Sequence, residues 1–197
     1  MPLVKKLVTQ LKFLLRITSS HDIVRRYFVV NGFDGALTML GLIMGFLLSS
    51  PADLTVIINA CLGAAVALGM SGLSSAYVSE TAERKRALEQ LEKAMVTDLH
   101  NSAHGEAARV VPWMVALVNG LAPLLISLLI LAPLLLANAG ISLPVSPLYG
   151  AIIIALALVF LLGVLLGRIG NISWLRSGLQ TLLLAIITAV LIYLLAG

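Results

Sequence analysis

The sequence predicts an all-α integral membrane protein with five transmembrane helices. Of its 197 residues, 60% are hydrophobic and only 11% are charged, whereas a soluble domain carries about 25% charged residues. Five apolar stretches have about the 20 residues that a spanning helix needs, and none alternates as the strands of a membrane barrel do. The stretches lie around residues 27–49, 54–79, 112–137, 148–167 and 175–196.

Lysine and arginine residues lie on only one side of this arrangement. They precede the first span and fill the second and fourth connections, and they are absent from the other two connections and the C-terminus. The positive-inside rule therefore predicts a cytoplasmic N-terminus and a C-terminus outside. These anchors account for the net charge of +4, so the expected partner is the lipid bilayer and no nucleic acid. Because no targeting extension is visible, we expect a multi-pass protein of a prokaryotic plasma membrane.

Residues 1–26 are expected to form an amphipathic helix at the cytoplasmic surface, and residues 27–197 the transmembrane domain. Apolar residues recur at helical spacing over residues 3–17, while the lysines there fall mostly on other faces. This pattern is typical of a helix that lies in the membrane interface.

The second span is predicted to continue into the cytoplasm as one helix to about Val96. Residues 79–95 contain neither Gly nor Pro and are rich in strong helix formers. Glu80 and Arg84 form a favourable i,i+4 pair. Residues 98–111 then predict a loop or a broken second helix, so the cytoplasmic segment spans about 80–111, and Pro112 is expected to begin the third span.

Asp34 is a carboxylate inside the first apolar stretch. An ionisable group at membrane depth costs at least about 2.5–3.5 kcal/mol, and such groups mark ion and proton pathways. Asn31 and Thr38 fall near the same helix face and also offer oxygen ligands. We therefore predict a transport path through these three residues, with Asp34 as a metal ligand. In the alternative, Asp34 bonds only to neighbouring backbone or to a partner helix.

The second span adds Met70, Ser71 and Ser74 to the predicted path. A thioether beside oxygen ligands suits a borderline-soft divalent metal better than Ca²⁺ or Mg²⁺. Met70 is therefore a candidate metal ligand, with simple packing as the alternative.

Acidic and histidine side chains of the cytoplasmic segment are candidates for collecting metal. Two Glu-x-x-Glu pairs each place two carboxylates on one helix face. The pairs are nine positions apart and about half a turn out of phase, so one straight helix cannot bring both to one ion. A solvated helix surface is the alternative. The candidates are Glu80, Glu83, Glu89, Glu92, His100 and His104.

Enzyme motifs are absent from the sequence. It contains no Gly-rich phosphate loop, no Gly-x-Ser-x-Gly elbow and no His-Glu-x-x-His. Cys61 is the single cysteine, so no Cys-x-x-Cys pair exists. We expect neither catalysis nor a permanently bound cofactor.

The order of these features is similar to that of a known family. The first span contains Asn31-Gly32-Phe33-Asp34-Gly35 and continues through Gly41 and Gly45, the second ends on Ala76-Tyr77-Val78-Ser79, and the third runs from Pro112-Trp113 through Gly120 to Pro133. The last two carry Gly163 to Gly170, then Trp174-Leu175-Arg176-Ser177-Gly178 and Tyr193. Over roughly residues 25–197 the chain resembles the vacuolar iron transporter family of divalent-metal transporters.

The resemblance implies a homodimer that moves Fe²⁺, and often Mn²⁺, out of the cytoplasm in exchange for protons. Asp34 matches the metal-path aspartate of the family's first helix. The family's second-helix methionine falls on Gly72 here, with Met70 two residues away, and the glutamate before the family's tyrosine is Ala76. The family's long cytoplasmic metal-binding domain is truncated or absent in this chain.

The sequence therefore predicts a divalent transition-metal transporter whose substrate is Fe²⁺ or Mn²⁺. The alternative is a non-transporting membrane scaffold or regulator. Its partner would bind the apolar stripe formed by Leu88, Leu91 and Met95 on the cytoplasmic helix.

Overall fold

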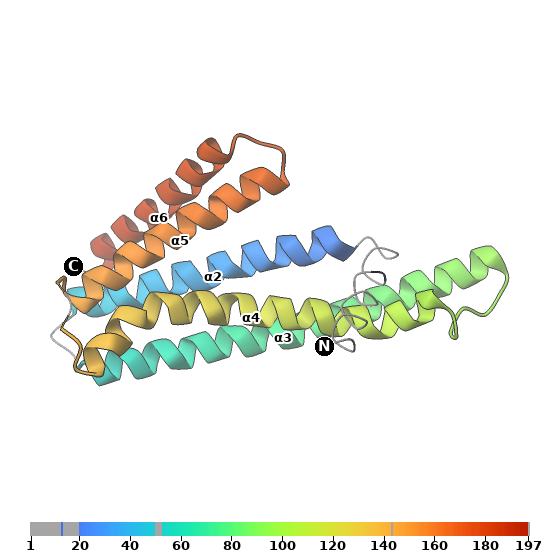
Figure 1. Ribbon diagram of the computed structural model, residues 1–197, viewed down its shortest axis with the longest axis horizontal. Coiled ribbons are helices and arrows are strands. Elements are labelled where there is room, and N and C mark those ends of the chain that lie inside the picture. The colour runs from blue at the N-terminus through green and yellow to red at the C-terminus, as the bar shows by residue number, and fades with distance from the viewer. Residues whose placement is uncertain (1–12, 14–19, 50–52, 143, 197) are drawn as a thin grey trace, which may run out of the picture.

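Five long α-helices make up the part of the chain that the computed structural model describes, which is residue 13 and residues 20–49, 53–142 and 144–196. No strand occurs among these residues (Figure 1). The helices are α2 (Ser20–Leu48), α3 (Leu54–Met95), α4 (Ala103–Asn138), α5 (Pro147–Ile169) and α6 (Trp174–Ala196).

Each of the five helices is long and apolar enough to cross a membrane, so the predicted all-α fold and its five spans are confirmed. The amphipathic helix predicted over residues 3–17 lies outside the described residues apart from Phe13. Residues 20–26, assigned to the same N-terminal segment, are the first turns of α2. The cytoplasmic side of the N-terminus stays a prediction from charge.

The second span does continue as one helix, as the sequence predicts. With 42 residues, α3 is about 63 Å long at 1.5 Å per residue, about twice the thickness of a bilayer core. It ends at Met95, where Val96 takes a left-handed conformation with φ of 50°. Figure 1 shows the C-terminal end of α3 and the N-terminal end of α4 projecting side by side beyond the other helices.

The prediction that Pro112 begins the third span is wrong. Helix α4 begins nine residues earlier, where the Ser102 hydroxyl accepts hydrogen bonds from the backbone N–H groups of His104 (3.2 Å) and Gly105 (3.4 Å). Pro112 lies buried inside the helix. A proline in a helix removes one hydrogen bond, and packing of the flanking turns on neighbouring helices makes this tolerable in membrane proteins.

Helix α2 packs against all four other helices, α4 packs against α2, α3 and α5, and α6 packs mainly against α5. Fully buried side chains of α2 and α4 fill the core, whereas many large apolar side chains on the outside are exposed, as lipid contact requires. The core side chains include Met39, Leu40, Ile43, Ile130, Leu131 and Leu134.

Glycines allow close helix contacts within this chain. Gly163 and Gly167 of α5 lie against Thr181 and Ser177 of α6, and a Cβ added at Gly167 would lie 2.8 Å from the Ser177 Cβ. The small-xxx-small motif of the fourth span therefore packs intramolecularly. No role in a dimer is needed to explain it.

Candidate functional site

Helices α2 and α3 both cross α4 at adjacent turns. A Cβ added at Gly35 of α2 would lie 2.7 Å from the carbonyl oxygen of Pro123. A Cβ added at Gly72 of α3 would lie 2.8 Å from the carbonyl oxygen of Asn119. Since real Cβ contacts are essentially never shorter than 3.0 Å, glycine at both positions lets the three backbones touch.

A chain of amide hydrogen bonds joins the three helices at this crossing. The Asn119 side chain, only 5% exposed, donates from Nδ2 to the Gly72 carbonyl at 2.6 Å. Its Oδ1 accepts from Asn31 Nδ2, which also donates to the Tyr27 carbonyl at 2.9 Å. Both ends of the buried amide are therefore satisfied. Sequence reasoning missed Asn119, although a lone amide inside an apolar span was a usable signal.

Asp34 lies beside this crossing but points the other way. It precedes Gly35 in the chain, yet its side chain is exposed on the outer surface of α2. Counted from Ile23, where the candidate span of 26 residues begins, it is about 16 Å along a helix of about 39 Å, near the middle of the span. Thr38 follows Asp34 by about one turn of α2 and is half-buried. Asn31 is also half-buried, but its side chain turns toward α4, where it bonds to Asn119. Among the described residues, no hydrogen bond to the Asp34 carboxylate is present.

The predicted path residues of α3 are also exposed. Met70 is 60% exposed, Ser71 and Ser74 are exposed too, and the Ser74 hydroxyl donates to the Met70 carbonyl at 2.8 Å. No hydrogen bond in the described part of the chain joins these residues to Asp34. Within one chain, Asp34 and the path residues of α3 thus lie on outer surfaces.

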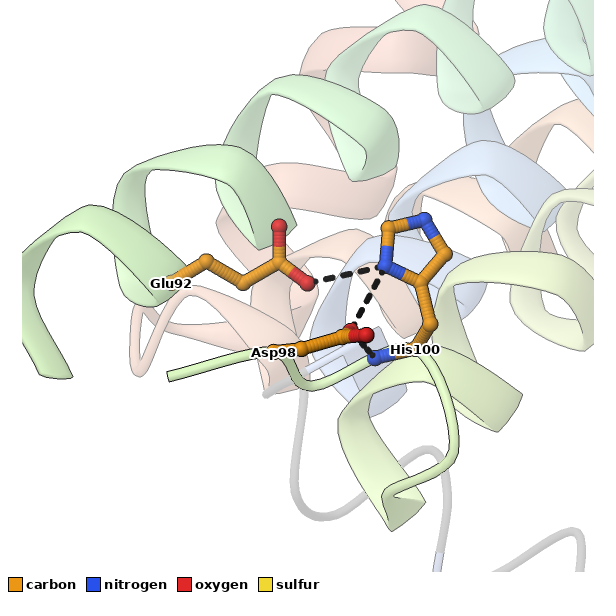
Figure 2. Close-up of side chains that lie close together, drawn as sticks. All are labelled: Glu92, Asp98 and His100. Atoms are coloured by element: carbon orange, nitrogen blue, oxygen red, sulfur yellow. Dashed lines mark hydrogen bonds and ion pairs between the residues drawn. The ribbon is translucent and has the colours of Figure 1, made fainter. Parts of the chain in front are cut away.

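A second group of candidate ligands forms where α3 ends and the chain turns toward α4 (Figure 2). His100 Nδ1 lies 3.0 Å from Glu92 Oε1 and 3.0 Å from Asp98 Oδ1. One potential ligand atom from each residue lies within 4.8 Å of the other two. Glu92 and His100 were predicted from the sequence as metal ligands, whereas Asp98 was not in that set. Its signal was the Asp-x-His spacing in a tight turn.

Backbone hydrogen bonds hold this group in place. The Leu99 N–H donates to Glu92 Oε1 at 2.9 Å, and the His100 N–H donates to Asp98 Oδ1 at 2.8 Å. The hydrogen bond with Asp98 and the charge of Glu92 raise the pKa of His100. Donation by the His100 backbone and ring lowers the pKa of Asp98. One imidazole nitrogen and two carboxylates suit Fe²⁺, Mn²⁺ or Zn²⁺ once the ring proton is displaced.

The other predicted cytoplasmic ligands lie elsewhere. Glu80 is 6% exposed and pairs with Arg84 at 3.2 Å, so the predicted i,i+4 pair is present and occupies this carboxylate. Glu83, Glu89 and His104 are exposed and lie outside the group of three around His100.

Two comparisons connect the chain with known proteins. The sequence model of the VIT family, the vacuolar iron transporter family, matches residues 85–197. An uncharacterized protein of Methanocaldococcus jannaschii is 32% identical over 171 residues, which cover 85% of this chain and 86% of that protein. The chain belongs to the VIT family. No solved structure matches it. The VIT family is a transporter family, so membership suggests metal ion transport and agrees with the expectation of a non-enzyme.

The fold bears on Gly72 and Ala76, the two positions that the resemblance compares with metal-binding residues of the family. The family's second-helix methionine would stand at Gly72, where even a Cβ would collide with the α4 backbone. The family's glutamate would stand at Ala76, which is 3% exposed and faces the interior. Met70 lies outside this packed face and remains open on the surface. Gly72 thus serves helix packing in this chain.

Proposed function

We propose that this protein carries a divalent transition metal, Fe²⁺ or Mn²⁺, out of the cytoplasm in exchange for protons. The exposure of Asp34 at mid-depth on the outer face of a spanning helix is the observation that carries the proposal. A bare carboxylate facing lipid is costly, so such a group requires water, a cation or another protein surface. Membership of a transporter family favours a cation path.

Asp34 can couple the two fluxes because a cation and a proton compete for the same oxygens. A nearby cation favours the ionised carboxylate, while burial without one favours the protonated form. Metal binding then releases a proton, and proton binding releases the metal. Thr38 and the Oδ1 atom of Asn31, whose Nδ2 atom is bonded to Asn119, would supply further oxygen ligands.

A homodimer would complete this path. Asp34 on α2 and Met70, Ser71 and Ser74 on α3 all lie on outer surfaces. A second copy with its α2 facing the first would place two carboxylates along one interface and remove them from lipid. The path would then run between the two chains.

The group of Glu92, Asp98 and His100 would collect metal before it enters the path. It lies on the helical pair that extends beyond the membrane-spanning length, and the side chains of His100 and Asp98 are 71% and 76% exposed. Solution metal can therefore reach the group without any rearrangement of the spanning helices.

The test is Fe²⁺ and Mn²⁺ flux into proteoliposomes with an imposed pH gradient. We compare the wild type with Asp34→Asn and with Asp53→Asn, which makes the same chemical change at an exposed residue before α3. Flux should require the gradient, disappear in Asp34→Asn and persist in Asp53→Asn. Unchanged flux in folded Asp34→Asn would remove Asp34 from the path, and absence of flux in the wild type would contradict the proposed substrates.

The scaffold alternative receives less support from the fold. Leu88 and Leu91 are half-buried and line a small cleft beside α4, while Met95 is 58% exposed. The chain's own α4 therefore covers much of the stripe that a partner would need. A soluble partner that co-purifies in equal amount and is lost on Met95→Glu, without metal flux, would favour the alternative.

A further inference from the structure

A cleft of about 990 Å³ opens between α2, α4 and the end of α5. Figure 1 shows why: α5 and α6 diverge from α2 and α4 toward the N-terminal end of α2. The cleft walls are largely apolar and include Phe28 of α2, Val118 of α4 and Leu165 of α5. Phe28 is 37% and Leu165 is 41% exposed, so these walls lack a partner in the described part of the chain.

Two arginines line the same cleft. Arg25 comes from the start of α2 and Arg168 from the last turn of α5. Among the residues whose side chains the structure describes, no carboxylate lines the cleft and neither arginine forms an ion pair with one. Two guanidinium groups facing one space repel each other and repel a metal cation. They suit an anion instead, because each can donate two parallel hydrogen bonds to a phosphate.

The arrangement of charge and apolar surface matches the membrane. Arg25 is two residues from the start of the span at Ile23, and Arg168 is one residue from the end of α5 at Ile169. Both charges therefore lie at headgroup depth on one side of the bilayer. Phe28 and Leu165, each three residues nearer the centre of its helix, lie about 4.5 Å deeper along the helices.

We propose that this cleft binds an anionic phospholipid, with its phosphate between Arg25 and Arg168 and an acyl chain along the apolar walls. Basic pockets between spanning helices are the kind of site that anionic headgroups occupy. Charge complementarity disfavours two other occupants. Residues 1–19 contain four basic and no acidic residues, and a second copy would bring the same two arginines. The volume is at the upper end of the about 300–1,000 Å³ typical of ligand sites.

The experiment counts lipids bound to the full chain by native mass spectrometry. Phosphatidylglycerol and phosphatidylcholine with identical acyl chains are titrated into the protein in neutral detergent. The variant Arg25→Gln/Arg168→Gln removes both cleft charges. The matched control is Arg26→Gln/Arg176→Gln. It removes one exposed arginine near the start of α2 and one near the start of α6, and neither arginine lines this cleft.

Phosphatidylglycerol should bind the wild type more tightly than phosphatidylcholine does. The cleft variant should lose roughly 30-fold in affinity for it, since each basic group near the surface contributes about a factor of five. The control should lose much less affinity than the cleft variant, because neither Arg26 nor Arg176 lines the cleft. Arg25→Lys/Arg168→Lys keeps the charge but loses the bidentate hydrogen bonds, so its affinity should lie between those of the wild type and the glutamine variant. Such an intermediate affinity also shows that the loss in the glutamine variant does not reflect misfolding.

Three results would overturn the proposal. Equal losses in the cleft variant and its matched control would indicate general attraction to a basic surface. Inorganic phosphate binding as tightly as the lipid, with the same arginine dependence, would indicate a site for a soluble phosphate. A cleft variant that loses its dimer and keeps its lipid would assign the cleft to a second copy. Metal flux enters none of these readouts, so they are independent of the proposed transport.

Discussion

Replacing Gly72 by Ala should destabilise the bundle, whereas the same change at Gly63 should stabilise it. Both glycines lie within α3. At Gly72 an added Cβ meets the Asn119 carbonyl oxygen at 2.8 Å and its carbon at 3.3 Å, while at Gly63 nothing lies within 4 Å. The Asn119 carbonyl receives no helical hydrogen bond from position 123, because Pro123 has no N–H. That oxygen belongs to the backbone and cannot turn aside.

The two substitutions share one energetic term and differ in the other. Each replaces a helical glycine by alanine, which gains about 0.5–1 kcal/mol from helix propensity. Only Gly72→Ala must push two backbones apart, at a cost of about 1–3 kcal/mol typical of overpacking. Propensity cancels in the comparison, so the two variants should differ by about 1–3 kcal/mol in unfolding free energy, with Gly63→Ala above the wild type.

Equilibrium unfolding in mixed micelles, followed by circular dichroism, measures this difference. Gly63→Ala controls for any general effect of adding a methyl group to α3. If Gly72→Ala is as stable as Gly63→Ala, the close crossing of α3 and α4 does not exist as described. The bonds of Asn119 across it would then lose their basis as well.

Three further changes test other parts of the molecule. Asn119→Leu should lower the unfolding free energy by about 1–2 kcal/mol, because it removes two interhelical hydrogen bonds of about 0.6 kcal/mol each and adds bulk. An unchanged unfolding free energy would contradict the chain of amide hydrogen bonds through Asn119. Glu80→Gln should lower the unfolding free energy by about 1–3 kcal/mol in the same assay, because the largely buried side chain of Arg84 loses an ionised partner. An equal loss of unfolding free energy in a Glu80→Gln/Arg84→Met double variant would argue against a stabilising ion pair. The turn around His100 should be best ordered between the lowered pKa of Asp98 and the raised pKa of His100. Its stabilisation is lost as pH rises through the second value or falls through the first. Amide exchange in the wild type and in Asp98→Asn measures this, and identical pH profiles would exclude the contact.

Hydropathy alone could predict most of the fold because a bilayer dictates the length and polarity of every span. The continuous α3 was also predictable, since no residue in its extension breaks a helix. Pro112 misled the prediction because a local rule about proline ignores the packing that neighbouring helices supply to α4. Packing against neighbouring helices, and not the local preference of proline, determines that Pro112 lies inside a helix.

The candidate site was harder to predict, for the same reason. Spacing along a straight helix could group glutamates only with each other, and it excluded a single ion for both pairs. The left-handed Val96 ends α3 and lets the chain turn back, so that His100 and Asp98 reach Glu92. The lone amide of Asn119 in an apolar span could have been noticed, but its hydrogen-bond partners could not, because they come from helices far away in the sequence.

Charge on the surface of the bundle limits where a cation can cross. Among the described residues, the large cleft within one chain holds two arginines and no carboxylate, so a divalent cation entering it meets net repulsion. The membrane-embedded carboxylate, Asp34, faces outward on the opposite side from the buried face of α2. On the proposed function, a cation path would follow the outer face of α2, where a second protein surface would shield it from lipid. Transport would then require the dimer. A variant that keeps the chain monomeric in proteoliposomes should therefore have no metal flux, even with Asp34 intact.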